Sequence, residues 1–189
     1  MTVQSPTQIT DRLSFRRASL ADVAQVRALV VSAFRGASSL AGWTTEAHLF
    51  TDERISKAGL VAKIQHPGTQ VIMALDEGDG GALLGCAEIV AADAAVQIGM
   101  VAVVPEIQNR GIGKALIAHL EEVARREYGA RSAEMCVIAS REDVIGFYGR
   151  RGYVKTERTK PFPYDLLVNG KALHDDLYFV VLEKTLSKQ

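Results

Sequence analysis

Two glycines and two cations lie close together in the middle of this sequence, in the stretch Gln108-Asn109-Arg110-Gly111-Ile112-Gly113-Lys114. An apolar β-branched run ends before it at Pro105, and apolar residues recur behind it at helical spacing as far as Gly129. A loop between a strand and a helix leaves the first helical amides unpaired at the positive end of the helix dipole. Glycines lack the Cβ atoms that would keep an anion's oxygens away. The pattern therefore predicts a phosphate-binding loop.

The spacing of the glycines excludes two common phosphate-binding loops. A nucleotide P-loop has four residues between its glycines and Ser or Thr after its lysine, whereas here only Ile112 separates the glycines and Ala115 follows Lys114. The dinucleotide fingerprint requires a third small residue at the position that Leu116 occupies. A glycine-rich turn that binds no ligand is the remaining alternative from the residues alone.

The Q-x-x-G-x-G pattern of Gln108, Gly111 and Gly113, with a hydrophobic strand and a proline before it, resembles the signature of the GNAT superfamily of acyl-CoA N-acetyltransferases. The resemblance implies acetyl-CoA as acyl donor and no metal. It also implies that backbone amides of the loop hold the pyrophosphate and that the strand backbone pairs with the pantetheine arm, with an amide near Val103 polarising the thioester carbonyl. The implied cofactor contacts are Val101, Val103, Gln108, Asn109, Arg110, Gly111, Ile112, Gly113 and Lys114.

A second segment, residues 144–153, resembles the family's segment whose tyrosine lies beside the thioester sulfur, and Tyr148 is that tyrosine. A phenol has a pKa near 10, so it is protonated at neutral pH and can protonate a departing thiolate. Family members often carry an asparagine seven residues earlier, where this chain has Arg141. The alternative is that Tyr148, like Phe147, belongs to a short helix and only packs that helix against the protein core.

The acceptor amine requires a base, because an alkyl amine with a pKa of about 10.4 is less than roughly 0.1% neutral at pH 7. Glu88 is one candidate, since it is the polar residue within the apolar run 83–90. A position that faces outward or lies at the edge of the sheet would explain it equally well. Trp43, Glu46 and His48 fall in the region that lines the acceptor pocket in this family. The alternative for Glu46 and His48 is that they are solvated helix residues.

The order of elements supports the same family over nearly the whole chain beyond residue 11. The patterns predict strands at 13–17, 71–75, 83–90, 98–104, 133–139, 153–158 and 177–182. They predict helices at 23–34, from Thr44 or Thr45 to 65, at 112–128 and at 143–150. We expect an α+β fold in three layers, with a mixed, mostly antiparallel central sheet of about seven strands flanked by helices.

Length and composition fit one globular domain. The chain has 189 residues, 48% hydrophobic and 23% charged, and we expect a flexible lead-in over 1–11 and one domain over 12–189. Lys and Arg number 22, as do Asp and Glu, so the net charge of zero predicts neither nucleic acid nor an anionic membrane as partner. We also expect the protein to be cytoplasmic, and a homodimer is compatible with the sequence. Cys86 and Cys136 are expected to be buried reduced thiols.

The predicted function is direct transfer of an acetyl group from acetyl-CoA to a primary amine of a small molecule or peptide, with Tyr148 as acid and Glu88 as base. The competing hypothesis is a catalytically silent acyl-CoA-binding sensor or interaction module, because cofactor capture needs only the loop and the strand backbone.

Overall fold

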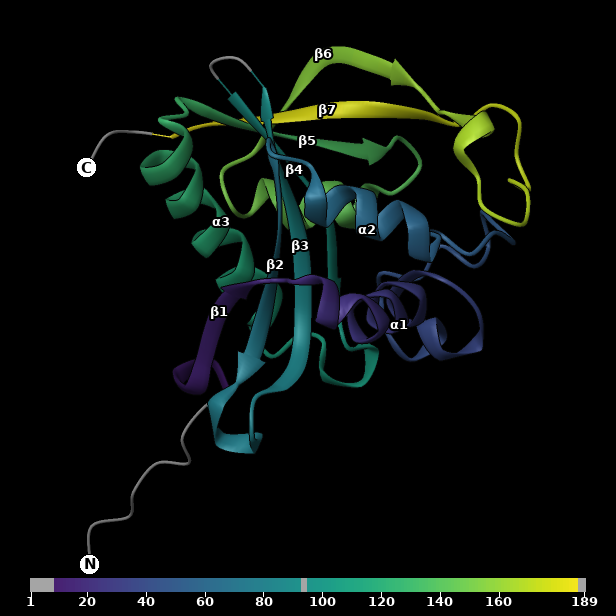
Figure 1. The fold of residues 1–189 in the computed structure, drawn as a ribbon. Coiled ribbons are helices and arrows are strands. Elements are labelled where there is room, and N and C mark those ends of the chain that lie inside the picture. The colour runs from purple at the N-terminus through teal and green to yellow at the C-terminus, as the bar shows by residue number, and fades with distance from the viewer. Residues whose placement is uncertain (1–8, 93–94, 187–189) are drawn as a thin grey trace, which may run out of the picture.

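The computed structural model describes residues 9–92 and 95–186, which form a seven-stranded sheet flanked by helices (Figure 1). The strand order is β1-β2-β3-β4-β5-β7-β6, and every neighbouring pair is antiparallel except β4 and β5. The strands are β1 (Leu13–Arg17), β2 (Thr69–Asp76), β3 (Ala82–Ala92), β4 (Ala95–Val103), β5 (Ser132–Ile138), β6 (Val154–Pro161) and β7 (Tyr178–Thr185). The mixed, mostly antiparallel sheet predicted from the sequence is confirmed.

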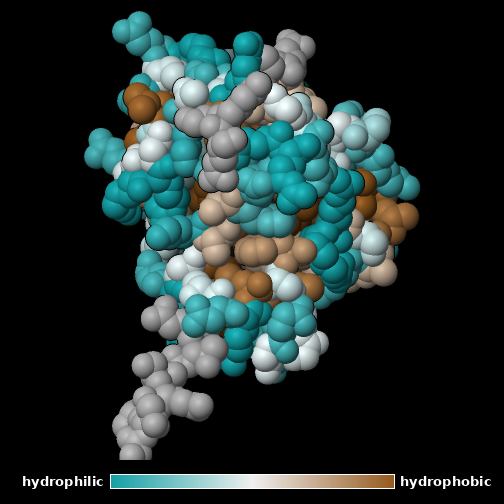
Figure 2. Space-filling view, turned by 90° about the vertical axis from the view of Figure 1, so that its left-hand side faces the viewer, coloured by the Kyte–Doolittle hydropathy of each residue, from teal (hydrophilic) through white to brown (hydrophobic). Residues whose placement is uncertain are grey.

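In the described residues, four α-helices cover the sheet: α1 (Val23–Phe34), α2 (Lys57–Gln65), α3 (Ile112–Tyr128) and α4 (Glu142–Gly149). Alternating β2 residues point to opposite faces, as the two-residue period of a strand requires. Ile72 and Ala74 pack in the core that includes α3, whereas Val71 and Met73 pack in the core that includes α1 and α2. The α3 face is mostly hydrophilic on its outside, with smaller hydrophobic areas (Figure 2).

The sheet opens at its centre. β4 and β5 pair only through Ala95–Gln97 and Ser132–Glu134, although β4 continues to Val103 and β5 to Ile138. On its other side β4 carries a bulge, because Met100 and Val101 together lie opposite Ala87 of β3, and Met100 has a φ of 51°. Within the part of the chain that the structure describes, the β4 backbone beyond Gln97 therefore has no strand partner toward β5, and a gap forms between the two strands.

The predicted helix from Thr44 or Thr45 to 65 is wrong in its first half. α2 begins at Lys57, where the hydroxyl of Ser56 accepts a hydrogen bond from the Gly59 amide at 2.9 Å. Residues 44–56 instead follow an irregular path, held by the buried Arg35 side chain and by backbone hydrogen bonds to the loop 162–177 between β6 and β7. These long-range contacts override the local helical pattern.

Two other features concern the ends of the chain and its helices. Ile9–Arg12 forms a 3-10 turn whose Ile9 packs against the core, while residues 1–8 of the predicted lead-in lie outside the described residues. Within the described residues, no helix is both long and apolar enough to cross a membrane.

Candidate active site

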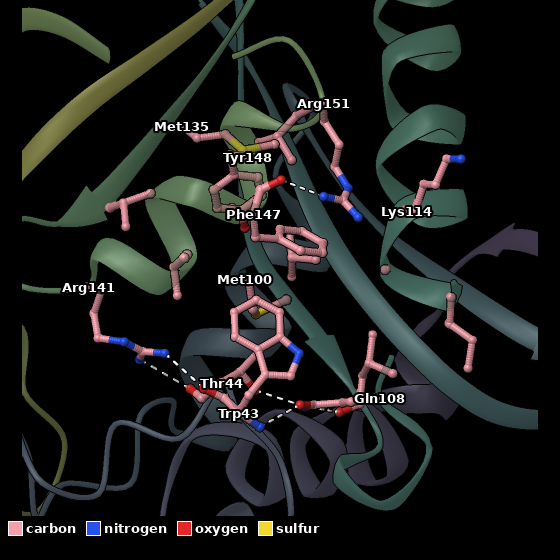
Figure 3. A pocket seen from close by; sticks show the side chains of 18 of the residues that line it. Trp43, Thr44, Met100, Gln108, Lys114, Met135, Arg141, Phe147, Tyr148 and Arg151 are labelled. Atoms are coloured by element: carbon pink, nitrogen blue, oxygen red, sulfur yellow. Dashed lines mark hydrogen bonds between the residues drawn. The ribbon is translucent and has the colours of Figure 1, made fainter. Parts of the chain in front are cut away.

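A cavity of about 330 Å³ lies where the gap between β4 and β5 meets the start of α3 and the helix α4 (Figure 3). We call it the glycine-loop cavity. The sequence-predicted residues that line it are Trp43, Val101, Val103, Gln108, Asn109, Gly111, Ile112, Gly113, Lys114 and Tyr148. Arg110, by contrast, is exposed on the loop and does not line the cavity. The structure thus brings these residues from one strand, two loops and two helices to a single opening.

The glycine loop has the backbone that the sequence predicts. Gly111 adopts a φ of 86° immediately before the first residue of α3, a conformation in which a side chain would be strained. A Cβ on Gly113 would lie 3.5 Å from the Phe147 ring and 3.7 Å from Val103. Larger side chains at position 113 would therefore fill the space between the helix and β4. The loop leaves the α3 N-terminus open toward the cavity.

Gln108 uses its side chain to position another segment. Its Oε1 accepts a hydrogen bond from the Trp43 amide at 2.8 Å, and its Nε2 donates to the Thr44 hydroxyl at 2.9 Å and to the Val103 carbonyl at 3.2 Å (Figure 3). A Cβ on Gly42 would lie 2.7 Å from the same Oε1. Gln108 therefore joins the loop after α1 to the glycine loop, and only its backbone remains for a ligand.

Arg141 holds the same loop from the α4 side (Figure 3). Arg141 is buried, with 6% of the residue exposed. Its guanidinium donates to the carbonyls of Trp43 at 3.1 Å and Thr45 at 3.0 Å, with a longer hydrogen bond to the carbonyl of Thr44. Asp143 accepts from the other edge of the guanidinium at 2.8 Å and 3.0 Å. The residue that replaces the family's asparagine is thus a wall of the cavity. The sequence near Arg141 does not indicate this role, because the three carbonyls that it binds lie almost a hundred residues away in the chain.

The charges around the glycine-loop cavity have one sign. Its lining includes no Asp or Glu among the described residues, and its cations are Arg54, Lys114, Arg141, Arg150 and Arg151. The Arg151 guanidinium stacks on the Phe147 ring at 3.4 Å from the centroid and donates to the Phe147 carbonyl. A cavity with cations, an open helix N-terminus and no carboxylate suits a polyanionic ligand.

Tyr148 lies inside this cavity between aromatic neighbours. Its ring is 5.3 Å from Phe147 and 6.0 Å from Tyr153, both edge-on. Burial raises the pKa of Tyr148 above its ordinary value of 10.0, an effect that the nearby Arg151 only partly offsets and to which the Glu46 carboxylate adds. The hydroxyl therefore keeps its proton throughout the neutral range.

A second cavity, of about 670 Å³, adjoins the first across the gap. We call it the aromatic cavity, because Phe162 lies in its wall with ring centroids 5.2 Å from Phe50 and 5.3 Å from Phe179. Residues that line both cavities are Arg54, Ile98, Gly99, Met100 and Cys136. The gap between β4 and β5 therefore connects the two spaces.

Both predicted carboxylates of the acceptor side line the aromatic cavity, and each is already paired. Both oxygens of Glu88, which is 8% exposed, accept from the Lys63 ammonium at 2.7 Å and 2.9 Å. Glu46 pairs with the buried Arg35 guanidinium at 2.5 Å, which also binds Asp52 at 2.6 Å. The outward-facing alternative for Glu88 is thus wrong, because the side chain is buried.

His48 and Cys136 are more exposed than expected for a pocket residue and a buried thiol. His48 is exposed and lines neither of the two cavities. Both cysteines are free; Cys86 is buried, and burial raises the pKa of its thiol to about 12. Cys136 is only half-buried, because it lies on β5 at the gap, so the prediction that both thiols are buried holds for Cys86 alone.

Residues 33–153, which include both strands of the gap, the glycine loop and Tyr148, match the acetyltransferase (GNAT) family model. The chain belongs to the GNAT family. The spermidine/spermine N-acetyltransferase SpeG from Vibrio cholerae has a similar fold at 14% identity and a TM-score of 0.64, covering 95% of this chain and 96% of that one. So does the ribosomal-protein-S18-alanine N-acetyltransferase from Escherichia coli, at 15% identity and a TM-score of 0.63, covering 94% and 96%.

A third similar structure, the paiA N-acetyltransferase from Thermoplasma acidophilum, is a complex with coenzyme A, at 15% identity and a TM-score of 0.64 over 92% of this chain and 98% of that one. The glycine-loop cavity offers cations, loop amides without a hydrogen-bond partner among the described residues and an unpaired strand edge, which are features that suit a phosphate-bearing ligand with an extended arm. Within the described residues, no group of three His, Cys, Asp or Glu side chains is arranged to hold a metal ion.

Proposed function

We propose that this protein is an acetyl-CoA-dependent N-acetyltransferase that acts on a primary amine. The observation that carries the proposal is the pair of cavities joined through the gap between β4 and β5, one lined by cations without carboxylates and the other lined by carboxylates and aromatic rings. A donor in the first cavity and an acceptor in the second would meet at the gap, where Tyr148 lies on the donor side.

The donor is held by backbone and charge. Amides of the glycine loop and the cations Lys114 and Arg150 would face the pyrophosphate, and the β4 edge from Val101 to Val103 would pair with the pantetheine arm. Acetyl-CoA supplies an activated acetyl group, whose carbonyl carbon exchanges its bond to sulfur for a bond to the amine nitrogen. An amide of the β4 edge can stabilise the charge that develops on the carbonyl oxygen.

Tyr148 serves the leaving sulfur. Its raised pKa lies above that of an ordinary thiol, about 8.5, so complete proton transfer to a thiolate in water would be uphill. Inside the cavity the thiolate is also deprived of water, which raises the pKa of the thiol. The difference between the pKa of Tyr148 and that of the thiol is therefore smaller than in water. We therefore assign Tyr148 as the hydrogen-bond donor that becomes the proton donor as the carbon–sulfur bond breaks.

The proton on the attacking amine leaves toward the aromatic cavity, where two carboxylates are candidates. Glu88 would have to give up its pairing with Lys63 to take a proton, because that ammonium occupies both of its oxygens. Glu46 pairs with Arg35 and is near enough to raise the pKa of Tyr148, so it lies close to the acid side of the reaction. Either carboxylate can be the first residue of a route that passes the proton to solvent.

The test is an amine panel in which release of free thiol from acetyl-CoA is followed at several pH values. We expect thiol release that depends on the amine and rises with pH as more of the amine becomes neutral. The acyl-CoA-binding sensor is the competing function, and it predicts a different result. Calorimetry would then show stoichiometric binding of acetyl-CoA, while no amine of the panel releases thiol.

A further inference from the structure

Arg54 lies at the junction of the two cavities, and its cation has no charged partner among residues 9–92 and 95–186. It lines both of them and is half-buried, with its guanidinium carbon 5.4 Å from the centroid of the Phe34 ring. Among the described residues, its side chain makes no ion pair and no hydrogen bond. A guanidinium has five N–H donors, and in a half-buried position without a protein acceptor it is suited to bind an anion.

The charge balance of the aromatic cavity points the same way. Its carboxylates, Glu46, Asp52 and Glu88, are each bound by Arg35 or Lys63. The cations that line it without an ion pair in the described parts of the chain are Arg54 and Lys160. An acceptor that enters this cavity therefore meets free positive charge and no free negative charge. A polycationic amine would be repelled there, and an anionic group would be attracted.

The backbone holds Arg54 in place at some cost. Within the described residues, two non-glycine residues other than asparagine have a left-handed φ, Arg54 at 63° and Met100 at 51°, and both line the wall shared by the two cavities. The neighbours of Arg54 are fixed, because Arg27 binds the Glu53 carboxylate at 2.6 Å and the Ile55 carbonyl at 3.1 Å. The guanidinium is thus presented to the junction by a rigid bend.

We propose that Arg54 binds a carboxylate of the acceptor, and that the acceptor is an α-amino acid or a similar small amine with an apolar side chain. This inference rests on the proposed acetyl transfer. The amine must reach the gap, and in an α-amino acid a single carbon separates it from the carboxylate, so the carboxylate falls beside a residue that lines both cavities. The side chain then lies against the aromatic wall of Phe50, Phe162 and Phe179.

A carboxylate could also arrive on the donor, as the far end of a longer acyl group such as succinyl. That source shares the chemistry but not the selectivity, since it makes Arg54 a determinant of donor choice rather than of acceptor choice. The experiment therefore pairs amines that differ only in the carboxylate and donors that differ only in the acyl group.

The test compares L-phenylalanine with phenethylamine, and acetyl-CoA with succinyl-CoA, in the parent protein, in Arg54→Gln and in the control Arg126→Gln, which removes an exposed arginine of α3. The parent should favour phenylalanine with acetyl-CoA. Arg54→Gln should lower kcat/KM for phenylalanine about 10- to 100-fold, chiefly through KM, because it removes a charged hydrogen bond. Any weaker binding of acetyl-CoA caused by the lost cation should affect both amines equally, so the ratio of kcat/KM for phenylalanine to kcat/KM for phenethylamine should itself fall about 10- to 100-fold, and the control should match the parent.

Two results would overturn the assignment while leaving acetyl transfer intact. One is equal turnover of both amines in the parent and in Arg54→Gln. The other is a preference for succinyl-CoA that Arg54→Gln abolishes, which would place the carboxylate on the donor. Binding of acetyl-CoA without thiol release with either amine would overturn the acceptor assignment, and the same result with every amine of the panel would contradict the proposed function itself.

Discussion

The two cavities that meet at β4 differ in how they are built. The glycine-loop cavity consists of a strand edge, a helix N-terminus and, among the described residues, cations without carboxylates, and the contacts that we propose for its ligand are largely with backbone atoms. The aromatic cavity is made from irregular segments around residues 46–55 and 160–168, where buried ion pairs and stacked rings decide the shape. A backbone site needs particular residues at fixed spacing, whereas a side-chain site can be assembled from many sequences.

The largest effect should come from placing an acid in the glycine-loop cavity. Gly113→Glu puts bulk against Phe147 and Val103 and negative charge where a pyrophosphate would bind. We expect the Kd of acetyl-CoA to rise at least about 100-fold and its stabilisation of the fold in thermal melting to disappear. Ala118→Glu adds the same charge to the exposed side of α3 and should bind like the parent. An equal thermal shift in both variants would show that the donor binds elsewhere.

Tyr148→Phe should separate catalysis from binding within the same cavity. The ring and its contacts with Phe147 and Tyr153 remain, and only the hydroxyl is lost. We expect kcat to fall roughly 100-fold, in the range of general-acid catalysis, with little change in the Kd of acetyl-CoA. Steady-state kinetics and calorimetry on one preparation check both values. Unchanged kcat with chemistry rate-limiting would make Tyr148 a packing residue.

A smaller effect is expected where the cavity wall is held from a distance. Arg141→Ala leaves the carbonyls of residues 43–45 without their buried donor, which should cost about 1–3 kcal/mol of unfolding free energy. The loosened wall should also raise the Kd of acetyl-CoA about tenfold. Chemical denaturation and calorimetry measure the two changes, and Arg126→Ala on the surface of α3 is the control. Arg141→Ala with the parent's stability would deny it this structural role.

The cysteines should differ in reactivity but contribute little to turnover. Native protein should react with a thiol reagent at Cys136, which borders both cavities, and this reaction should slow when acetyl-CoA is bound. Cys86 should react only after unfolding, since burial raises its pKa to about 12. Cys136→Ala should keep its kcat. Loss of turnover in that variant would instead indicate an acyl-cysteine step.

No alkaline loss of activity should arise from Tyr148 within the ordinary working range. The acid must be protonated, and its pKa is raised from 10.0, so the active form persists from neutral pH to at least pH 10 and is lost only as pH rises beyond. A plot of kcat against pH for the parent should show no descending limb below that point. A limb near neutral pH that Tyr148→Phe removes would contradict the raised pKa.

The sequence allowed good prediction of the regions where structure depends on local patterns. The strand at 13–17 and the helix at 112–128 are confirmed, because alternation and the glycines at 111 and 129 act within a few residues. The prediction of a helix that begins at Thr44 or Thr45 was wrong, because Arg35 binds Glu46 and Asp52 in a buried ion-pair cluster that holds this segment in an irregular path. The ion pair between Lys63 and Glu88 could not be predicted from the sequence either, since nothing local to either residue indicates it.

The most direct test of the account is a single-turnover reaction of the protein with acetyl-CoA, followed by mass spectrometry of the intact protein and of the small molecules, with and without an amine acceptor. Direct transfer between the two cavities predicts an unmodified protein in both cases, and acetylated amine equal in amount to the free thiol when the acceptor is present. An acetylated protein, or bound acetyl-CoA that yields no acetylated amine across the panel, would contradict it.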